Sequence, residues 1–277
     1  MKSFIDKLLK NKLAFIGFII IILIAVSAIL APVLAPYNPN KMDLSNTLLP
    51  SGSSGHLLGT DNYGRDILSR IIYGSRISLI VAVSSIFIGG IIGSILGLLA
   101  GYYGGRIDAV IMRIMDALFA FPFVLLAIIL MTVLGQGLVN LIIAISITNI
   151  PGFARIVRGE AMVIKRSEFI EATKSIGASD FRIIFRHVFP NSVASMTVYS
   201  TMSIAGAILS EASLSYLGLG IQPPTATWGN ILKGGQEYIT SNPEMAVYSG
   251  IAILITVLGF NLFGDGLRDV LDPKTNN

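Results

Sequence analysis

The sequence predicts an all-α membrane protein with six transmembrane helices and with both termini in the cytoplasm. Of its 277 residues, 53% are hydrophobic and only 13% are charged, whereas an average soluble domain has about 25% charged residues. Several uncharged runs exceed the roughly 20 residues that a helix needs to cross a bilayer. The mean hydropathy of +0.75 agrees with this class.

The first 76 residues are expected to form one unit, made of an interfacial helix, the first span and an external loop. Lysines at 2, 7, 10 and 12 alternate with apolar residues, which is typical of an amphipathic helix on the membrane surface. The uncharged run 13–34 predicts the first span. A cleaved signal peptide is the alternative, but its apolar core is usually only ~7–15 residues long. Turn-forming residues predict a loop over 35–76.

The second span is predicted over 77–105, and its glycines recur at every fourth position. This spacing places them on one helix face, where small residues let another helix backbone come close. We therefore expect a helix-packing face made of Gly89, Gly93, Gly97 and Gly101. A merely flexible, glycine-rich span is the alternative, and the strict period argues against it.

Four further spans follow from the pattern of uncharged runs and turn residues. The third is predicted over 110–134 and the fourth over 138–150, with Gly135-Gln136-Gly137 as the turn between them and Pro151-Gly152 as the end of the fourth. The fifth and sixth spans are predicted over 192–217 and 245–264, separated by a polar, turn-rich segment. These spans belong to a core unit that covers 77–268.

The segment 149–191 is predicted to be a charged helical hairpin. Apolar residues recur at near-helical spacing up to Ile176, and Gly177 stands where a helix stop is expected. Ser179 and Asp180 can cap a second helix, which Pro190 should limit. A charged hairpin between two spans is typical of a docking surface for a soluble partner.

The distribution of basic residues predicts the orientation. With the N-terminus inside, the inner segments hold fifteen Lys and Arg residues and the outer segments hold five. The positive-inside rule then puts the hairpin in the cytoplasm. Arg65, Arg70 and Arg76 go against the rule, and an external vestibule is one place for them.

The hairpin resembles the EAA loop of permease subunits in binding-protein-dependent ABC importers. The residues that carry the likeness are Glu171-Ala172-Thr173, Gly177 and the run 187–191, with Thr173 where alanine is usual. The resemblance implies a MetI-like permease fold and a coupling loop over 155–191 that seats in a groove of an ATPase subunit. The implied contact residues are Glu171, Ala172, Thr173, Gly177, Ala178, Ser179 and Asp180.

Three other segments resemble the C-type subunit of the dipeptide, oligopeptide and nickel permeases. They are the run from Gly59-Thr60-Asp61 to Leu79, the run 211–220 followed by Trp228-Gly229, and the run 261–269. Leu57 departs from the group, which often has proline there. The matches occur in the family's order and cover nearly the whole chain.

The resemblance implies a multi-pass subunit of a bacterial inner membrane importer. Its partners would be a second permease subunit, two cytoplasmic ATPases that hold ATP and Mg, and an external substrate-binding protein. The substrate would be a peptide rather than nickel or a metal chelate, because peptide systems form the larger part of the group. No cofactor is expected on this chain.

The sequence argues against several other classes. It has no P-loop motif, no H-E-x-x-H and no cysteine, so we expect neither an enzyme nor a metal site. His56 and His187 fall on opposite sides of the predicted membrane and cannot share a metal. The net charge of +4 does not indicate nucleic-acid binding, since the basic residues flank spans. A secondary transporter or a scaffold protein remains a remote alternative, although no inverted repeat is evident.

Two acidic residues carry open alternatives. Glu211 lies deep in an apolar run, where it could line the translocation path or could pair near the outer end of the fifth span. Asp116, near Pro122, could belong to a cytoplasmic gate, or could form an i,i+3 ion pair with Arg113.

Overall fold

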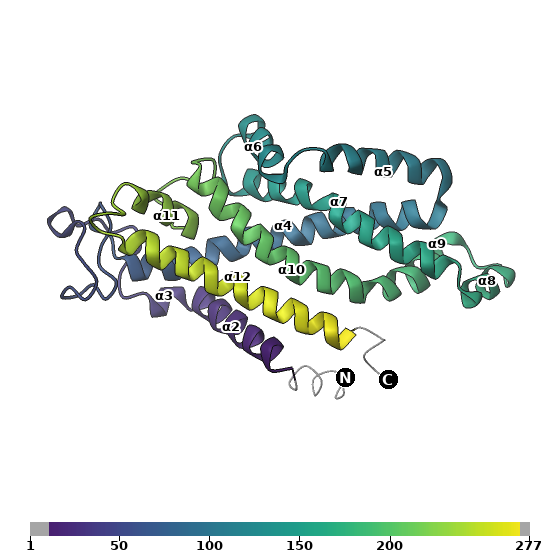
Figure 1. Cartoon of the computed structure of the whole chain (residues 1–277), viewed down its shortest axis with the longest axis horizontal. Coiled ribbons are helices and arrows are strands. Elements are labelled where there is room, and N and C mark those ends of the chain that lie inside the picture. The colour runs from purple at the N-terminus through teal and green to yellow at the C-terminus, as the bar shows by residue number, and fades with distance from the viewer. Residues whose placement is uncertain (1–10, 272–277) are drawn as a thin grey trace.

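The computed structural model describes residues 11–271 as an elongated helical bundle (Figure 1). These residues form no strand. The five longest helices are α2 (Lys12–Ile29), α4 (Ile67–Tyr103), α7 (Leu138–Lys165), α10 (Phe189–Tyr216) and α12 (Glu244–Leu271). The shorter ones are α3 (Ala31–Leu34), α5 (Gly105–Phe119), α6 (Phe123–Leu134), α8 (Glu168–Ser175), α9 (Asp180–Ile183) and α11 (Trp228–Gln236). The predicted interfacial helix lies almost wholly outside the described residues.

The predicted membrane class is confirmed, and the structure has five candidate spans, or six if the bent pair α5 and α6 counts as one span. Five helical segments are long and apolar enough to cross a membrane, and α5 with α6 makes a sixth candidate. The Gly135-Gln136-Gly137 turn separates α6 from α7 as expected, with positive φ angles at both glycines. Asn140 closes this turn by donating hydrogen bonds to the carbonyl oxygens of Leu134 and Gly135.

The third span is not the straight helix that 110–134 predicts. Helices α5 and α6 meet at an angle of 91° across the break at Ala120, Phe121 and Pro122. Proline lacks an N–H and disfavours helical geometry in the residue before it, so the helix ends before Pro122. The bend turns α6 away from α5 (Figure 1).

The predicted end of the fourth span at Pro151-Gly152 is wrong. Helix α7 continues through Pro151 to Lys165. Proline is tolerated inside membrane helices when neighbouring helices support the backbone. That support is present here, because Pro151, Gly152 and Phe153 are all buried and Phe153 packs edge-on against Tyr199 of α10.

The four glycines of the second span lie against the backbone of α7. A Cβ at Gly89, Gly93, Gly97 or Gly101 would stand 2.5–2.7 Å from a carbonyl oxygen of α7. The facing residues are Ser146, Ile150, Ala154 and Arg158, so both helices advance four residues at each step. The two helices therefore run parallel at backbone contact, and this is the most extensive helix pair in the described structure.

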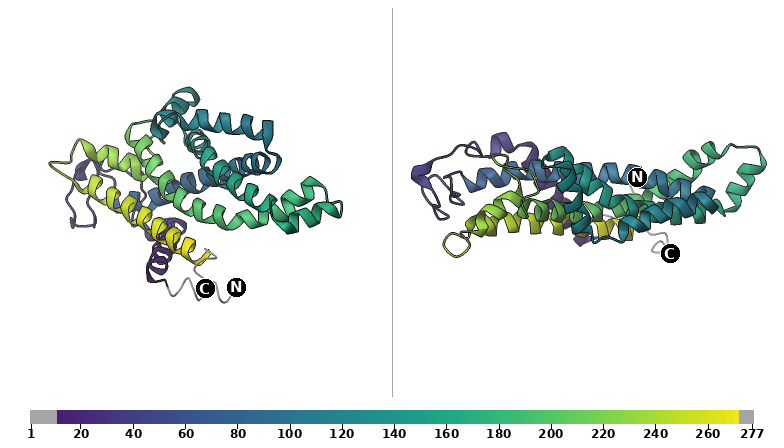
Figure 2. Two further views of the ribbon diagram at one scale, coloured as in Figure 1. Left: turned by 45° about the vertical axis from the view of Figure 1, so that its right-hand side comes forward. Right: turned by 90° about the horizontal axis from the view of Figure 1, so that it is seen from above.

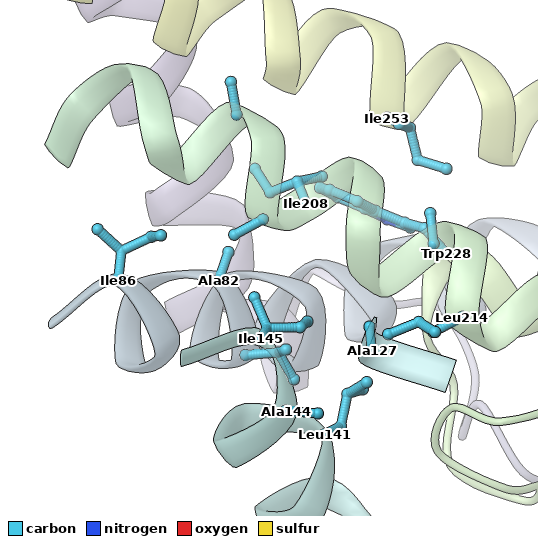
Figure 3. Packing of buried hydrophobic residues seen from close by; sticks show 14 of the residues in the cluster. Ala82, Ile86, Ala127, Leu141, Ala144, Ile145, Ile208, Leu214, Trp228 and Ile253 are labelled. Carbon is cyan, nitrogen blue, oxygen red and sulfur yellow. The ribbon is translucent and has the colours of Figure 1, made fainter. Parts of the chain in front are cut away.

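The hydrophobic core fills the space between α4, α6, α7, α10 and α12 (Figure 3). Figure 3 shows Ala82, Ile145 and Ile208 converging from α4, α7 and α10. Trp228 of α11 closes this core at one end, where its indole N–H donates to the Ile71 carbonyl oxygen at 3.0 Å.

Helix α2 packs antiparallel on α12 through small residues. A Cβ at Gly17 would lie 2.6 Å from the backbone nitrogen of Phe263, and Gly266 faces Ala14. Asn11 caps α2 and also donates to the carboxylate of Asp269 at 3.3 Å. The first span is thus attached to the bundle through the last one.

The segment before α4 is folded by the charged residues of its sequence motif. Asp61 accepts hydrogen bonds from the backbone N–H and the Nε of Arg65, and Arg70 lies 3.5 Å from the same carboxylate. Asp66 caps α4 and bonds His56 at 2.9 Å. Arg65 of this loop and Arg70 in the first turn of α4 are therefore buried, and both form ion pairs with Asp61.

Candidate functional site

The predicted hairpin projects from one end of the bundle, opposite α11 (Figures 1 and 2). It consists of α8, α9 and a π-helical turn, Ile184–Val188, which leads directly into α10. Two predicted boundaries are wrong. The first helix is interrupted at Arg166 and Ser167, and Pro190 does not end the second one. In a π turn each hydrogen bond spans five residues instead of four, and this turn accommodates Pro190, which has no N–H. The chain therefore remains helical from Asp180 to Tyr216.

Gly177 ends α8 in a left-handed conformation, with φ of +84°. The N–H of Gly177 donates to the Lys174 carbonyl oxygen, and that of Ala178 donates to the carbonyl oxygen of Thr173. This pair of bonds is a Schellman motif, which favours glycine at the left-handed position. Ser179 then caps α9 by accepting from the N–H of Arg182. The bend between the two short helices is therefore fixed by backbone hydrogen bonds.

The inner face of the hairpin packs on the ends of α4 and α7. Ile170 of α8 and Ile183 of α9 are both fully buried there. They belong to a separate apolar cluster whose other buried members are Leu98, Tyr102, Val157, Ala161, Ile184 and Val188. Because this cluster joins α4, α7, α8 and α9, we expect the hairpin to move with the spans and not as a loose loop.

The outer face of the hairpin exposes large apolar side chains. Ile176 is 85% exposed, Phe181 is 71% exposed and Phe185 is 52% exposed. The rings of Phe181 and Phe185 are 4.5 Å apart. Exposed charged residues stand near them in the sequence of the hairpin, namely Glu171, Lys174, Arg182 and Arg186. Large exposed apolar side chains in a segment that also carries exposed charges are typical of a protein interaction surface.

Tyr102, near the end of α4, attaches the hairpin to the bundle. Its side chain is buried, and its hydroxyl donates to the Asp180 carboxylate at 2.6 Å. The ammonium groups of Lys165 and Lys174 lie over its ring, at 5.5 and 5.3 Å from the centroid. One aromatic ring thus contacts the last residue of α7, helix α8 and the start of α9.

Replacing Tyr102 with phenylalanine should loosen the hairpin without emptying the cluster. The lost hydrogen bond has a charged acceptor, but water can reach Asp180, so we expect a loss of about 1 kcal/mol. Amide hydrogen exchange over 168–183 should then accelerate about fivefold. Tyr103→Phe is the matched control, because Tyr103 is exposed and makes no hydrogen bond in the described structure. Equal exchange in the two variants would contradict the role of Tyr102.

The predicted coupling residues occupy two different environments. Glu171, Ala172 and Gly177 are exposed on the outer surface. Asp180 is exposed as well, but its carboxylate accepts the Tyr102 hydroxyl. Thr173 bonds the Phe169 carbonyl oxygen within α8. The sequence analysis did not identify Tyr102, although its place one residue after Gly101 on α4 was a usable signal.

Two ion pairs join α5 to α7, and the predicted pairing of Asp116 with Arg113 is wrong. Asp116 accepts from Arg155 of α7 at 2.7 Å, and the Arg155 guanidinium also lies over the Phe119 ring. Nearer the hairpin, Arg158 donates to both carboxylate oxygens of Asp108. Helix α5 lies alongside α7, and both of these carboxylates face that helix. The spacing of the residues in the sequence does not predict this arrangement.

Glu211 is fully buried inside the bundle. Its two carboxylate oxygens accept from Ser78 of α4 at 2.9 Å and from Ser215 at 2.8 Å. Ser78 also lies 3.5 Å from the backbone nitrogen of Trp228, the first residue of α11. Buried polar groups are costly unless hydrogen-bonded, so this cluster fixes how α4, α10 and α11 meet.

A half-open cavity of about 490 Å³ lies between α7, α10 and α12, in the half of the bundle nearer the hairpin. Its lining combines apolar side chains with Glu160, Tyr199 and Arg268. Glu160 accepts from Ser195 at 2.7 Å. The cavity therefore holds a carboxylate and a guanidinium in one space whose other lining is apolar, apart from the hydroxyls of Ser195 and Tyr199.

Comparisons with known proteins agree on one class of membrane protein. Residues 93–277 match the family described as binding-protein-dependent transport system inner membrane component. Residues 1–50 match the N-terminal TM domain of oligopeptide transport permease C. The glutathione transport system permease protein GsiD of Pectobacterium atrosepticum is 48% identical over 93% of this chain and 85% of its own length. The GsiD protein of an Escherichia coli strain is 50% identical over 96% of this chain and 88% of its own length.

A solved structure shares the fold. It is a chain of the MetNI methionine ABC transporter in an inward-facing conformation. The two chains superpose with a TM-score of 0.60 and 20% identity, over 74% of this chain and 97% of that chain.

Proposed function

We propose, from the premise that this chain belongs to the family of binding-protein-dependent transport system inner membrane components, that it forms half of the translocation path for short peptides. As a family member, the chain is a permease of a bacterial ABC importer in the inner membrane, and ATP hydrolysis belongs to separate subunits. A second permease subunit would complete the path. An external binding protein would deliver the substrate.

The exposed outer face of the hairpin carries this proposal. Ile176, Phe181 and Phe185 would enter an apolar groove of an ATPase subunit. The exposed charged residues of the hairpin would fix its position in that groove. Glu171 makes no ion pair with any described residue, so it is free to meet a basic residue of that subunit. ATP and Mg would bind only to the ATPase, whose motion would reach the spans through α7 and α10.

A peptide substrate is supported by the named relatives. The GsiD proteins are described as glutathione transport permeases, and glutathione is a peptide. The cavity between α7, α10 and α12 would suit the charged ends of a short peptide, since it holds both Glu160 and Arg268.

The proposed orientation places the hairpin and both termini in the cytoplasm. The start of α2 and the end of α12 lie toward the end of the bundle that carries the hairpin (Figure 1). The loop before α4 and helix α11 lie at the opposite end, where the external binding protein would dock. The fifteen basic residues assigned to the inner segments support the same orientation.

We assign Glu211 and Asp116 to positioning and not to substrate contact. Glu211 would hold α11 on α4 and α10 through Ser78 and Ser215. Asp116 would tie α5 to α7 through Arg155, so that α5 follows the motion of the hairpin. A gate at the cytoplasmic end of the path would then open as α5 and α7 move together.

The proposed function is tested by uptake into proteoliposomes that hold the permease pair, the ATPases and the binding protein. We expect ATP-dependent accumulation of glutathione or of dipeptides. Glu171→Arg should leave the permease in the membrane and lower ATP-driven uptake about tenfold, because a like charge would face the basic residue of the ATPase.

Glu237→Arg is the control for ATPase binding alone, since Glu237 is an exposed glutamate directly after α11, at the end of the bundle opposite the hairpin. It should bind the ATPase as the unmodified chain does. Uptake that proceeds without ATP, or full coupling in Glu171→Arg, would refute the proposed function.

A further inference from the structure

Arg76 of α4 is a membrane-level cation without a protein partner. It is the last charged residue before the uncharged run 77–105, so it lies where α4 enters the bilayer. It is half-buried, and it makes no hydrogen bond or ion pair with residues 11–271. Arg65 and Arg70, by contrast, share the carboxylate of Asp61.

Two cavities meet at Arg76, one with a mixed lining and one with a mostly apolar lining. The one toward the loops has a volume of about 420 Å³, and its lining mixes polar with apolar residues: Asn38, Asn40, Tyr73 and Thr225 with Pro39, Ile77, Ile80 and Ala226. The one toward the middle of the bundle has a volume of about 450 Å³ and lies between α2 and α4. Apart from Arg76 and Ser84, its lining is apolar: Ala25, Ala28, Ile29, Leu79, Ile80 and Val83. Arg76 and Ile80 line both cavities, so the two adjoin along α4, and we refer to them together as one groove with a more polar half near the loops and an apolar half.

The order of the two halves matches the membrane. The polar half adjoins the loops, where headgroups and water lie, and the apolar half extends along α4 toward the hydrocarbon. An unpaired guanidinium binds phosphate oxygens strongly and with a defined geometry. A helix of another protein could fill the apolar half, but it would leave Arg76 buried without a counter-ion, which is costly.

We propose that the groove between α2 and α4 binds an anionic phospholipid, with its phosphate on Arg76 and an acyl chain along Ala28, Ile80 and Val83. The bound lipid would fill the space between the first span and the rest of the bundle. Helix α2 otherwise contacts the bundle mainly through α12, so the lipid would also hold the outer end of the first span in place.

The test measures lipid retained by the purified permease complex. The complex is exchanged into detergent that contains phosphatidylglycerol or phosphatidylcholine, and bound lipid is counted by native mass spectrometry. We expect the unmodified complex to retain phosphatidylglycerol in preference to phosphatidylcholine. Arg76→Gln should weaken phosphatidylglycerol binding about fivefold, the effect of one basic residue near an anionic surface.

Two further variants separate the headgroup from the acyl chain. Val83→Trp should fill the apolar half and lower the retention of both lipids, because Val83 lines the groove and is 48% exposed. Arg113→Gln is the control, since Arg113 is an exposed arginine of α5 without an ion pair in the described structure. It should retain lipid as the unmodified chain does.

Three results would overturn the proposal. One is equal retention of phosphatidylglycerol in Arg76→Gln and the unmodified complex. Another is unchanged retention of both lipids in Val83→Trp. The third is displacement of the lipid by inorganic phosphate at equal concentration, which would show a phosphate site that does not need the acyl chain.

Discussion

Gly97→Leu should prevent stable packing of the bundle. A Cβ at Gly97 would lie 2.5 Å from the carbonyl oxygen of Ala154 and 3.0 Å from the backbone nitrogen of Arg158. Both atoms belong to the α7 backbone and cannot rotate away, so α4 and α7 must separate. Overpacking by a few methylenes in a close-packed core typically costs about 1–3 kcal/mol, and a backbone clash should cost at least about 3 kcal/mol.

The measurement is the thermal stability and the membrane yield of the purified permease. Gly250→Leu is the matched control, because Gly250 lies inside α12 and a Cβ there would meet nothing within 4 Å. We expect a much lower melting temperature, or no folded protein, for Gly97→Leu and a small change for Gly250→Leu. Equal stability of the two variants would show that α4 and α7 do not rely on backbone contact.

The parts of the fold that sequence could predict are those that depend on local chemistry. Uncharged runs located the spans because charged side chains are costly in lipid. Each span could be predicted as a helix because a helix satisfies its backbone polar groups internally. The period of Gly89, Gly93, Gly97 and Gly101 identified a packing face, although it could not identify α7 as the helix that it meets. Gly177 indicated a helix end because few residues other than glycine adopt its φ at low cost.

Proline is where the sequence analysis failed, since its effect depends on tertiary surroundings. Pro122 does separate two helices. Pro151 lies inside α7, where packing against neighbouring helices replaces the support that the missing N–H removes. Pro190 is the second residue of α10, which directly follows a π turn. The same residue type therefore has three outcomes, and only the packed structure distinguishes them.

The candidate site was predicted in part. The charged outer surface and the turn at Gly177 follow from residue order within one segment. Its attachment to the bundle does not, because Tyr102 and Asp180 are far apart in sequence and meet only when α8 and α9 fold back on α4. The same holds for Glu211 and Ser78, and for Arg158 and Asp108, which lie on different helices.

These contacts bear on how motion would cross the chain. Only Arg166 separates the end of α7 from the N-cap of α8, and α9 is continuous with α10. The buried cluster around Ile170 and Ile183 fills the space between them. A displacement of the outer face of the hairpin would therefore reach two spans at once, and the ion pairs of Asp108 and Asp116 would pass it on to α5.

Gly177→Val should uncouple uptake from ATP hydrolysis while leaving the permease assembled. The φ of +84° at Gly177 costs an ordinary L-residue about 1–2 kcal/mol, and more for a β-branched one. A Cβ at this position would meet nothing within 4 Å, so the cost comes from the backbone and not from crowding within this chain. We expect the Schellman turn to rearrange, α8 to shift relative to α9, and ATP-driven uptake to fall about tenfold.

Two further variants identify the reason for that loss. Gly159→Val is the matched control, because Gly159 is an exposed glycine of α7 with helical geometry and open space around it. It should transport almost as the unmodified chain does. Gly177→Asn keeps the left-handed conformation accessible, so it should retain most of the uptake if the backbone angle is what matters. Loss of uptake in Gly177→Asn would instead show that the ATPase approaches this residue too closely for any side chain, whereas full uptake in Gly177→Val would mean that the turn does not transmit the motion.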